Sequence, residues 1–287
     1  MAEAESEQPT RGVVSKVAAI AIAVVLLLVG IGVGWVVSTL LVAPEPAPTS
    51  TIEKIYRTGV IVVGTDAAFP PFENVNATTG QIEGFDIDLI NEIAKLMGVR
   101  VDVRNTGWDP LFIQIPDRTL DMGISAMTIT DVRNQTLLFS DPYFFSDLTI
   151  VIRAGGPMVG VISGPADLQG KRIAFQEFTT SDAWVNDTLI GQMGIQPSQI
   201  RKTVLFTDAI GLLVADEVDV VVIDKPVAEG YQSAGQVTIV YTIVTNEAFG
   251  IPMPRGEFAL KAIVDAALKQ IRETGKYDAL IQKWFVL

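Results

Sequence analysis

The residues of this chain best suited to bind a charged small molecule lie in one stretch, Ser125-Ala126-Met127-Thr128-Ile129-Thr130-Asp131-Val132-Arg133. It follows a short apolar run, Met122-Gly123-Ile124, that is typical of the end of a buried strand. Thr130 or Asp131 is a suitable N-cap for a helix after it. Free N–H groups at a helix start, exposed hydroxyls and the guanidinium of Arg133 would together bind one carboxylate. Taken alone, Arg133 fits a solvated helix arginine better than a binding residue.

The composition excludes several other kinds of site. The 287 residues include no His and no Cys, so the chain has no Ser-His-Asp triad, no His or thiolate metal site and no Cys nucleophile. A net charge of −12 leaves too few cations to form a face that binds nucleic acid. The sequence therefore points to no metal, no cofactor and no nucleic-acid partner. Its length allows two domains of ordinary size.

One segment is apolar enough to span a membrane. Residues 17–42 contain no charged side chain, and as a helix they would measure roughly 39 Å, enough to cross a bilayer core of about 30 Å. Arg11 and Lys16 precede the segment and Glu45 follows it, so the positive-inside rule places the N-terminus in the cytoplasm. We expect an uncleaved single-pass anchor in the cell membrane. A cleaved signal peptide is the alternative, although its apolar core is usually about 7–15 residues long.

The segments on either side of this anchor are short. Residues 1–16 form a cytoplasmic tail too short for a signalling domain, and residues 43–52 form a Pro-rich linker of the semi-rigid kind. Everything that follows is expected outside the cell or in the periplasm.

The outer part begins with an α/β unit. Residues 59–64 are a continuous apolar run, which is typical of a strand buried on both faces. Because ligands bind at the carboxyl ends of strands in open α/β sheets, the loop after this strand places Asp66, Phe69 and Phe72 for binding. Phe72 is equally suited to the core. An amphipathic helix over residues 86–97, a strand over 99–103 and a helix beginning at Trp108 complete the unit.

A second α/β unit follows, and the chain then returns to the first. Its expected strands are residues 171–175, 202–206 and 218–223, the last ending at Asp224, and its helices are 179–193 and 208–216. Strands over 236–244 and 249–253 lead back to two C-terminal helices. This order predicts a two-lobed α/β fold with two hinge crossings, in which lobe 1 is residues 53–146 and 243–287 and lobe 2 is residues 147–242.

At this point a resemblance emerges. Residues 53–287 resemble the polar amino-acid-binding proteins of ABC uptake systems, which are family 3 extracellular solute-binding proteins with the type II periplasmic-binding-protein fold. Six stretches carry the resemblance: Gly64-Thr-Asp-Ala-Ala-Phe-Pro-Pro-Phe72, Gly84-Phe-Asp-Ile-Asp-Leu89, residues 125–133, Phe139-Ser-Asp-Pro-Tyr143, Asp219-Val-Val-Val-Ile-Asp224, and Gly275-Lys-Tyr-Asp278 with Lys283-Trp-Phe285.

The resemblance implies a receptor that closes on one free amino acid and delivers it to an ABC-type permease. It implies that Arg133 binds the α-carboxylate, helped by Thr128 and the loop at Thr180, and that Asp224 binds the α-ammonium from the other lobe. The remaining implied contacts are acceptors at Ser125 and Ala126, an aromatic pair at Phe69 and Trp108, and polar groups for the ligand side chain at Asp66 and Gln176.

Two departures from the family pattern bear on the ligand. Phe178 stands where the family often has Gly before its Thr-Thr pair, and Glu177 is unusual at its position. Asp66, Glu177 and the aromatic pair favour a basic side chain, and glutamine remains open. The receptor is expected to be a monomer. Asn76, Asn134 and Asn186 begin glycosylation triplets.

Two other functions compete with this one. A cyclohexadienyl or arogenate dehydratase-like enzyme would use the same scaffold, with Glu177 or Asp182 as general acid. A ligand-sensing module would pass closure through the anchor to a separate partner.

Overall fold

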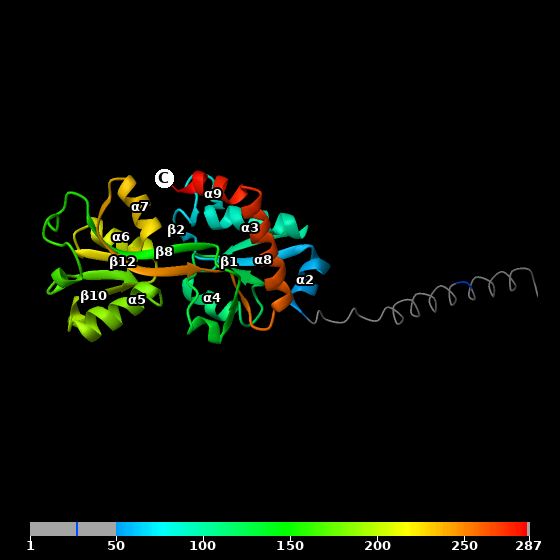
Figure 1. The fold of residues 1–287 in the computed structure, drawn as a ribbon, viewed down its shortest axis with the longest axis horizontal. Helices are drawn as coiled ribbons and strands as arrows, with labels where there is room; N and C mark the ends of the chain where they lie inside the picture. The colour runs from blue at the N-terminus through cyan, green and yellow to red at the C-terminus, as the bar shows by residue number, and fades with distance from the viewer. Residues whose placement is uncertain (1–26, 28–49, 286–287) are drawn as a thin grey trace, which may run out of the picture. The chain divides into compact units, whose positions relative to one another are not determined.

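The computed structural model describes residue 27 and residues 50–285 (Figure 1). The predicted tail, almost all of the predicted anchor and most of the predicted linker lie outside the described residues. Within the part of the chain that is described, no helix is both long enough and apolar enough to cross a membrane. Helix α2 (Thr51–Thr58) includes the last two residues of the predicted linker. Its N-cap is Ser50, whose hydroxyl accepts a hydrogen bond from the N–H of Glu53.

The first lobe is built on a parallel sheet of three strands in the order β5-β1-β6. Its strands are β1 (Val60–Thr65), β5 (Arg100–Asn105) and β6 (Met122–Gly123). A small antiparallel sheet contains β2 (Ala68–Phe69), β3 (Glu73–Val75) and β4 (Ile82–Glu83). The helices are α2, α3 (Phe85–Met97), α4 (Trp108–Gln114), α8 (Phe258–Glu273) and α9 (Lys276–Trp284).

The second lobe contains a five-stranded sheet in the order β10-β9-β11-β8-β12. Its strands are β8 (Phe144–Arg153), β9 (Ile173–Gln176), β10 (Ile200–Thr203), β11 (Val220–Asp224) and β12 (Val237–Phe249). Strands β9, β10 and β11 are parallel, and β8 is antiparallel to both β11 and β12. The helices are α5 (Thr180–Trp184), α6 (Phe206–Val214) and α7 (Lys225–Ser233), with short 3-10 turns at Pro165–Leu168 and Pro197–Gln199.

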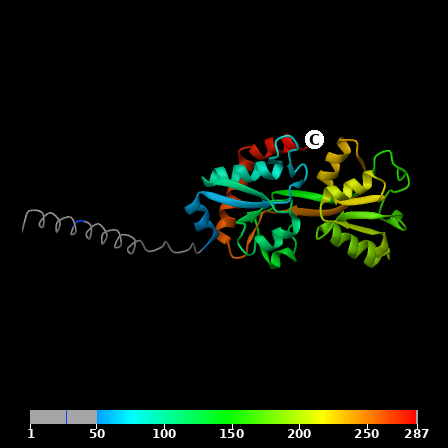
Figure 2. The ribbon, with the colours of Figure 1, turned by 180° about the vertical axis from the view of Figure 1, so that it is seen from behind.

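Two long strands join the lobes. In Figure 1, and from behind in Figure 2, β8 and β12 run side by side from one lobe to the other. The predicted lobe boundaries, after residues 146 and 242, fall within these strands. The β8–β12 register shifts between Ile243 and Glu247, where Oδ1 of Asp147 accepts hydrogen bonds from the N–H groups of Thr245 and Asn246. A bulge capped in this way interrupts the ladder where the strands pass between the lobes.

Helix α3 packs through the apolar face that its spacing predicts. Helix α3 buries Ile90, Ala94 and Met97 against the first sheet and α8. It ends at Gly98, whose φ of 73° is the left-handed conformation that glycine adopts without strain. Phe72, for which the sequence left core and contact open, is fully buried in this core.

Some elements differ from the expectation. The helix predicted to open at Thr130 or Asp131 is only a 3-10 turn, Arg133–Gln135, and the prediction of a helix was wrong. Thr130 still accepts a hydrogen bond from the N–H of Arg133, but the chain then enters β7 (Leu137–Phe139), which pairs with β13 (Pro252–Pro254). Because β7 pairs with β13, the chain is extended from Leu137 and no second helical turn follows. The helix expected over 179–193 continues past α5 as a π-helix, Val185–Gln192.

Candidate functional site

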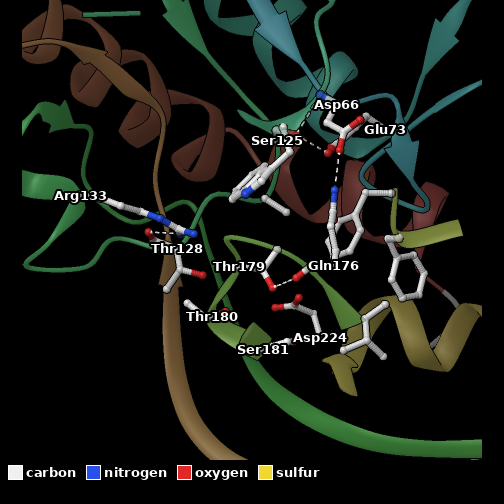
Figure 3. Close-up of a pocket in the computed structure, with 15 residues that line it drawn as sticks. Asp66, Glu73, Ser125, Thr128, Arg133, Gln176, Thr179, Thr180, Ser181 and Asp224 are labelled. Atoms are coloured by element: carbon white, nitrogen blue, oxygen red, sulfur yellow. Dashed lines mark hydrogen bonds between the residues drawn. The ribbon is translucent and has the colours of Figure 1, made fainter. Parts of the chain in front are cut away.

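A pocket between the lobes collects side chains from the carboxyl ends of both parallel sheets, the position in which open α/β sheets bind ligands (Figure 3). The empty space between these side chains, including the part open to solvent, is about 470 Å³. All ten residues predicted from the sequence line it: Asp66, Phe69, Trp108, Ser125, Ala126, Thr128, Arg133, Gln176, Thr180 and Asp224.

Arg133 is held in place by main-chain oxygens and aromatic rings. Its guanidinium donates to the carbonyl oxygen of Thr128 (2.8 Å) and to that of Phe178 in the other lobe (3.3 Å). It lies 5.1 Å from the ring centroid of Trp108 and 5.4 Å from that of Phe112. Burial lowers the pKa of Arg133 to about 10, and nearby carboxylates partly offset this effect. At neutral pH Arg133 is therefore a positioned cation with donors left for an anion.

The helix start that the sequence placed after Thr130 is supplied by the second lobe instead. Thr179 is the N-cap of α5 and its hydroxyl accepts from the N–H of Asp182, so Thr180 and Ser181 are the first two helical residues. Both line the pocket. The first N–H groups of a helix have no partner within the helix, and they favour an anion. Arg133 and the start of α5 therefore present, from both lobes, groups of the kind that can bind a carboxylate.

Asp224 provides a buried negative charge on the second-lobe side. It ends β11 and precedes α7, but its side chain makes no capping hydrogen bond with that helix. Within the described part of the chain, its buried Oδ1 has no hydrogen-bond partner. Burial, and then the charge of Glu247, raise the pKa of Asp224 well above its usual value, while Arg133 lowers it. A buried carboxylate oxygen without a partner is costly unless a cation meets it.

A second acidic region lies at the end of the pocket formed by the first lobe. Gln176 donates to Oδ2 of Asp66 across the lobes (3.0 Å), and Ser125 donates to Oε1 of Glu73 (2.7 Å). Glu73 was not predicted as a site residue, although it directly follows the Pro-Pro-Phe loop that was. Burial raises the pKa of Asp66, and burial followed by the charge of Asp86 raises the pKa of Glu73. These acids would be stabilised by a second cation.

Asp86 supports this region from α3. Its Oδ2 accepts hydrogen bonds from the N–H of Ala126 and from the hydroxyl of Tyr143, each at 2.8 Å. Ala126 has a φ of 44°, in the left-handed region that only a few non-glycine residues adopt. The hydrogen bond from its N–H to Asp86 fixes the backbone between Ser125 and Thr128. Burial raises the pKa of Asp86 to about 7, although its hydrogen bonds lower it.

Aromatic side chains form part of the pocket wall. Phe69 of the first lobe packs edge to face on Phe206 of the second, with ring centroids 5.5 Å apart. Trp108 donates from Nε1 to the carbonyl oxygen of Phe178 (3.1 Å), so it too bridges the lobes. Phe178 has a φ of 61°, which explains why glycine suits this position, and its side chain is exposed. Phe206 was not predicted as a site residue; the sequence placed it in a strand over residues 202–206, whereas it opens α6.

Glu247 lies behind the pocket and was also missed. It is buried on β12 next to the bulge, and its Oε2 accepts hydrogen bonds from the hydroxyls of Thr128 (2.6 Å) and Thr180 (2.9 Å). Glu177 and Asp182 do not line the pocket. Asp182 instead pairs with Lys202 at 2.8 Å. Asp182 does line the neighbouring hollow, which shares Arg133, Thr179 and Thr180 with this pocket.

Comparison with known proteins agrees with this geometry. The profile of the bacterial extracellular solute-binding proteins, family 3, matches residues 61–286. A probable histidine-binding protein of Neisseria gonorrhoeae is 30% identical over 244 residues, covering 83% of this chain and 86% of that protein.

Two solved structures share the fold. A P235GK mutant of ArgBP from T. maritima has a TM-score of 0.74 at 34% identity and covers 82% of this chain and 98% of its own. The ancestral amino acid-binding protein AncCDT-1, described as a precursor of cyclohexadienyl dehydratase, has a TM-score of 0.74 at 33% identity and covers 83% of this chain and 100% of its own.

Proposed function

The chain belongs to the bacterial extracellular solute-binding proteins of family 3, and we propose that it binds one free basic L-amino acid between its lobes. The observation that carries this proposal is the charge arrangement of the pocket. Among the described residues that line it, Arg133 is the one cation, while Asp66, Glu73 and Asp224 are acids. A basic amino acid has one carboxylate and two cations, so its charges can each meet an opposite charge.

Each end of the ligand has a matching group. The α-carboxylate would bind Arg133 and the first N–H groups of α5, and the α-ammonium would bind the unpartnered Oδ1 of Asp224. The cationic side chain would extend between Phe69 and Trp108 toward Asp66 and Glu73. A glutamine ligand would leave those two acids without a cation, which is why we favour a basic side chain over glutamine.

Binding is coupled to closure because the partners come from both lobes. A ligand shifts an equilibrium between open and closed forms only through contacts that differ between them. Arg133 and Asp224 lie on opposite lobes, and so do the hydrogen-bonded residues Gln176 and Asp66. A zwitterion that contacts both sides favours the closed form, and a permease that recognises this form would receive the ligand.

Calorimetric titration of the full-length chain, purified in mild detergent, with the twenty amino acids tests the proposal. We expect arginine or lysine to bind with a Kd in the micromolar range or tighter, and glutamine to bind at least tenfold more weakly. If every amino acid binds with a Kd above about 1 mM, a binding free energy weaker than roughly −4 kcal/mol, the proposal is refuted.

We also propose that residues 17–42 anchor this receptor in the membrane by an uncleaved helix, with the binding lobes outside. The charge-free length of the segment and the cations before it support this. The intact N-terminus should be found by mass spectrometry on protein extracted from membranes with detergent. Protein that starts after residue 42 and fractionates without membranes would show a cleaved signal instead.

A further inference from the structure

Thr128 and Thr180 both line the pocket, and their hydroxyls both donate to the same carboxylate oxygen, Oε2 of Glu247. A hydroxyl has one proton and two lone pairs, and an ionised carboxylate can only accept. Each threonine proton is therefore committed to Glu247, and what each hydroxyl can offer a ligand is a lone pair. The 2.6 Å separation between Thr128 and Glu247 is typical of a charge-assisted hydrogen bond.

We propose, on the basis of the function proposed above, that Glu247 sets the hydrogen-bond polarity of the pocket, making the hydroxyl of Thr128 an acceptor for the ligand's α-ammonium. This role differs from the one the family resemblance implies for Thr128, which is to help bind the α-carboxylate. Glu247 does not line the pocket, so it is a positioning residue that acts through Thr128.

The acceptors around the ammonium site then match its donors. An ammonium carries three N–H donors. Oδ1 of Asp224 and the lone pair of Thr128 would supply two acceptors, and the carbonyl oxygen of Ser125, another residue that lines the pocket, would supply the third. The negative charge of Glu247 acts on the same region, because it is among the causes that raise the pKa of Asp224. The carboxylate keeps Arg133 and the start of α5.

The groups around Glu247 hold it in this role. Asp147 on β8 caps the bulge that precedes Glu247. The two strands that join the lobes therefore fix the backbone position of Glu247. Burial raises the pKa of Glu247, and the hydrogen bonds from Thr128 and Thr180 and the charge of Arg133 lower it. Two hydroxyls that converge on one oxygen are the surroundings expected of an ionised carboxylate.

Two ligands distinguish a change in the hydrogen-bond polarity of the pocket from a general loss of protein stability. L-arginine has the α-ammonium, and 5-guanidinopentanoate is the same molecule without it. We expect the wild-type chain to bind L-arginine at least about 100-fold more tightly. Glu247→Met removes the acceptor at similar side-chain length and frees both threonine protons. It should weaken L-arginine binding by about 10- to 100-fold and change 5-guanidinopentanoate binding by less than about threefold.

Two further variants test whether Glu247 acts through Thr128 and remain informative if Glu247→Met folds poorly. Glu247→Gln keeps an acceptor oxygen but removes the charge, so it should weaken L-arginine binding by only about three- to tenfold. Thr128→Val should lose the same selectivity as Glu247→Met. In the double variant, Glu247→Met should then add less than about threefold to the loss caused by Thr128→Val.

The outcomes are distinct. An equal loss of affinity for both probes in Glu247→Met and in Thr128→Val would show a purely structural role and overturn the inference alone. Tighter binding of both probes would show that Glu247 competes with the ligand carboxylate, which also overturns it. A wild-type chain that binds no amino acid overturns the proposed function and this inference together.

Discussion

Replacing Asp224 by Asn should change ligand affinity and the stability of the ligand-free protein in opposite directions. The substitution keeps the shape of the side chain and removes its charge. Removing one partner of a buried, hydrogen-bonded charge pair costs about 2–5 kcal/mol, so the Kd for L-arginine should rise roughly 30- to 5,000-fold. Calorimetric titration at pH 7 measures this loss.

Stability should rise because the ionised Asp224 is buried with an unpartnered oxygen. The pKa of Asp224 is raised in the folded chain, so between its unfolded and folded pKa values the folded state binds more protons than the unfolded state. The free energy of unfolding therefore falls as the pH rises through that window. Asp224→Asn avoids this penalty. We expect its free energy of unfolding to exceed that of the wild type by at least about 1 kcal/mol at neutral pH, or about 2–4 °C in Tm. The difference should vanish below about pH 4.

Asp219→Asn is the matched control from just before the other end of the same strand. Arg172 pairs with Asp219 at 2.8 Å, and its hydrogen bond lowers the pKa of Asp219. This substitution should slightly lower the Tm and leave the Kd unchanged. An Asp224→Asn variant that binds L-arginine with the wild-type Kd, or that melts at a lower temperature than the wild type, would refute the assignment of Asp224 to the ammonium.

Three further predictions follow from the same contacts. Arg133→Lys keeps a positive charge but loses the planar guanidinium that donates to two main-chain oxygens. Calorimetry should show L-arginine binding weakened at least about 100-fold, and binding within tenfold of the wild type would contradict this. Burial raises the pKa values of Glu73 and Asp86, so the free energy of unfolding in urea should fall between pH 5 and pH 7 by about 1.4 kcal/mol per pH unit for each extra proton that the folded state binds. The fall should be less steep in Glu73→Gln, and a flat or rising profile in the wild type would argue against the buried pair. Phe178→Gly should leave the Kd for L-arginine within about threefold of the wild type. It should change the free energy of unfolding by no more than about 1 kcal/mol, because relief of the positive φ of Phe178 opposes the greater entropy of glycine in the unfolded chain. A larger loss of affinity would assign the Phe178 side chain a role in binding.

The sequence predicted the strand ends that flank the pocket because their signals are local, and the resemblance supplied the roles of the residues there. Apolar runs such as residues 59–64 mark buried strands, and the polar residues after them fall at the carboxyl ends of those strands in any parallel sheet. Asp66 and Asp224 could therefore be assigned to one cleft without coordinates. Helix α3 and its glycine end were equally readable, because period and capping are properties of consecutive residues.

Other features depended on which segments pair. The residues after Thr130 have a suitable cap, yet pairing of β7 with β13 stops the helix, and the N–H groups at the pocket come from α5. Local propensity was overridden there by tertiary contact, which is the usual limit of such reasoning. The roles assigned to the ten pocket residues and the lobe boundaries stay predictions.

What the sequence by itself determined is a two-lobed α/β chain whose strand ends carry one arginine and several acids toward a shared cleft. Only the tertiary structure decided how those charges are distributed. Glu73 and Glu247 lie 174 positions apart and belong to different sheets, and neither stands out in its own segment. Burial and hydrogen-bond direction are set by neighbours distant in sequence, so a residue such as Glu247 can be assigned only when the groups that donate to it are known.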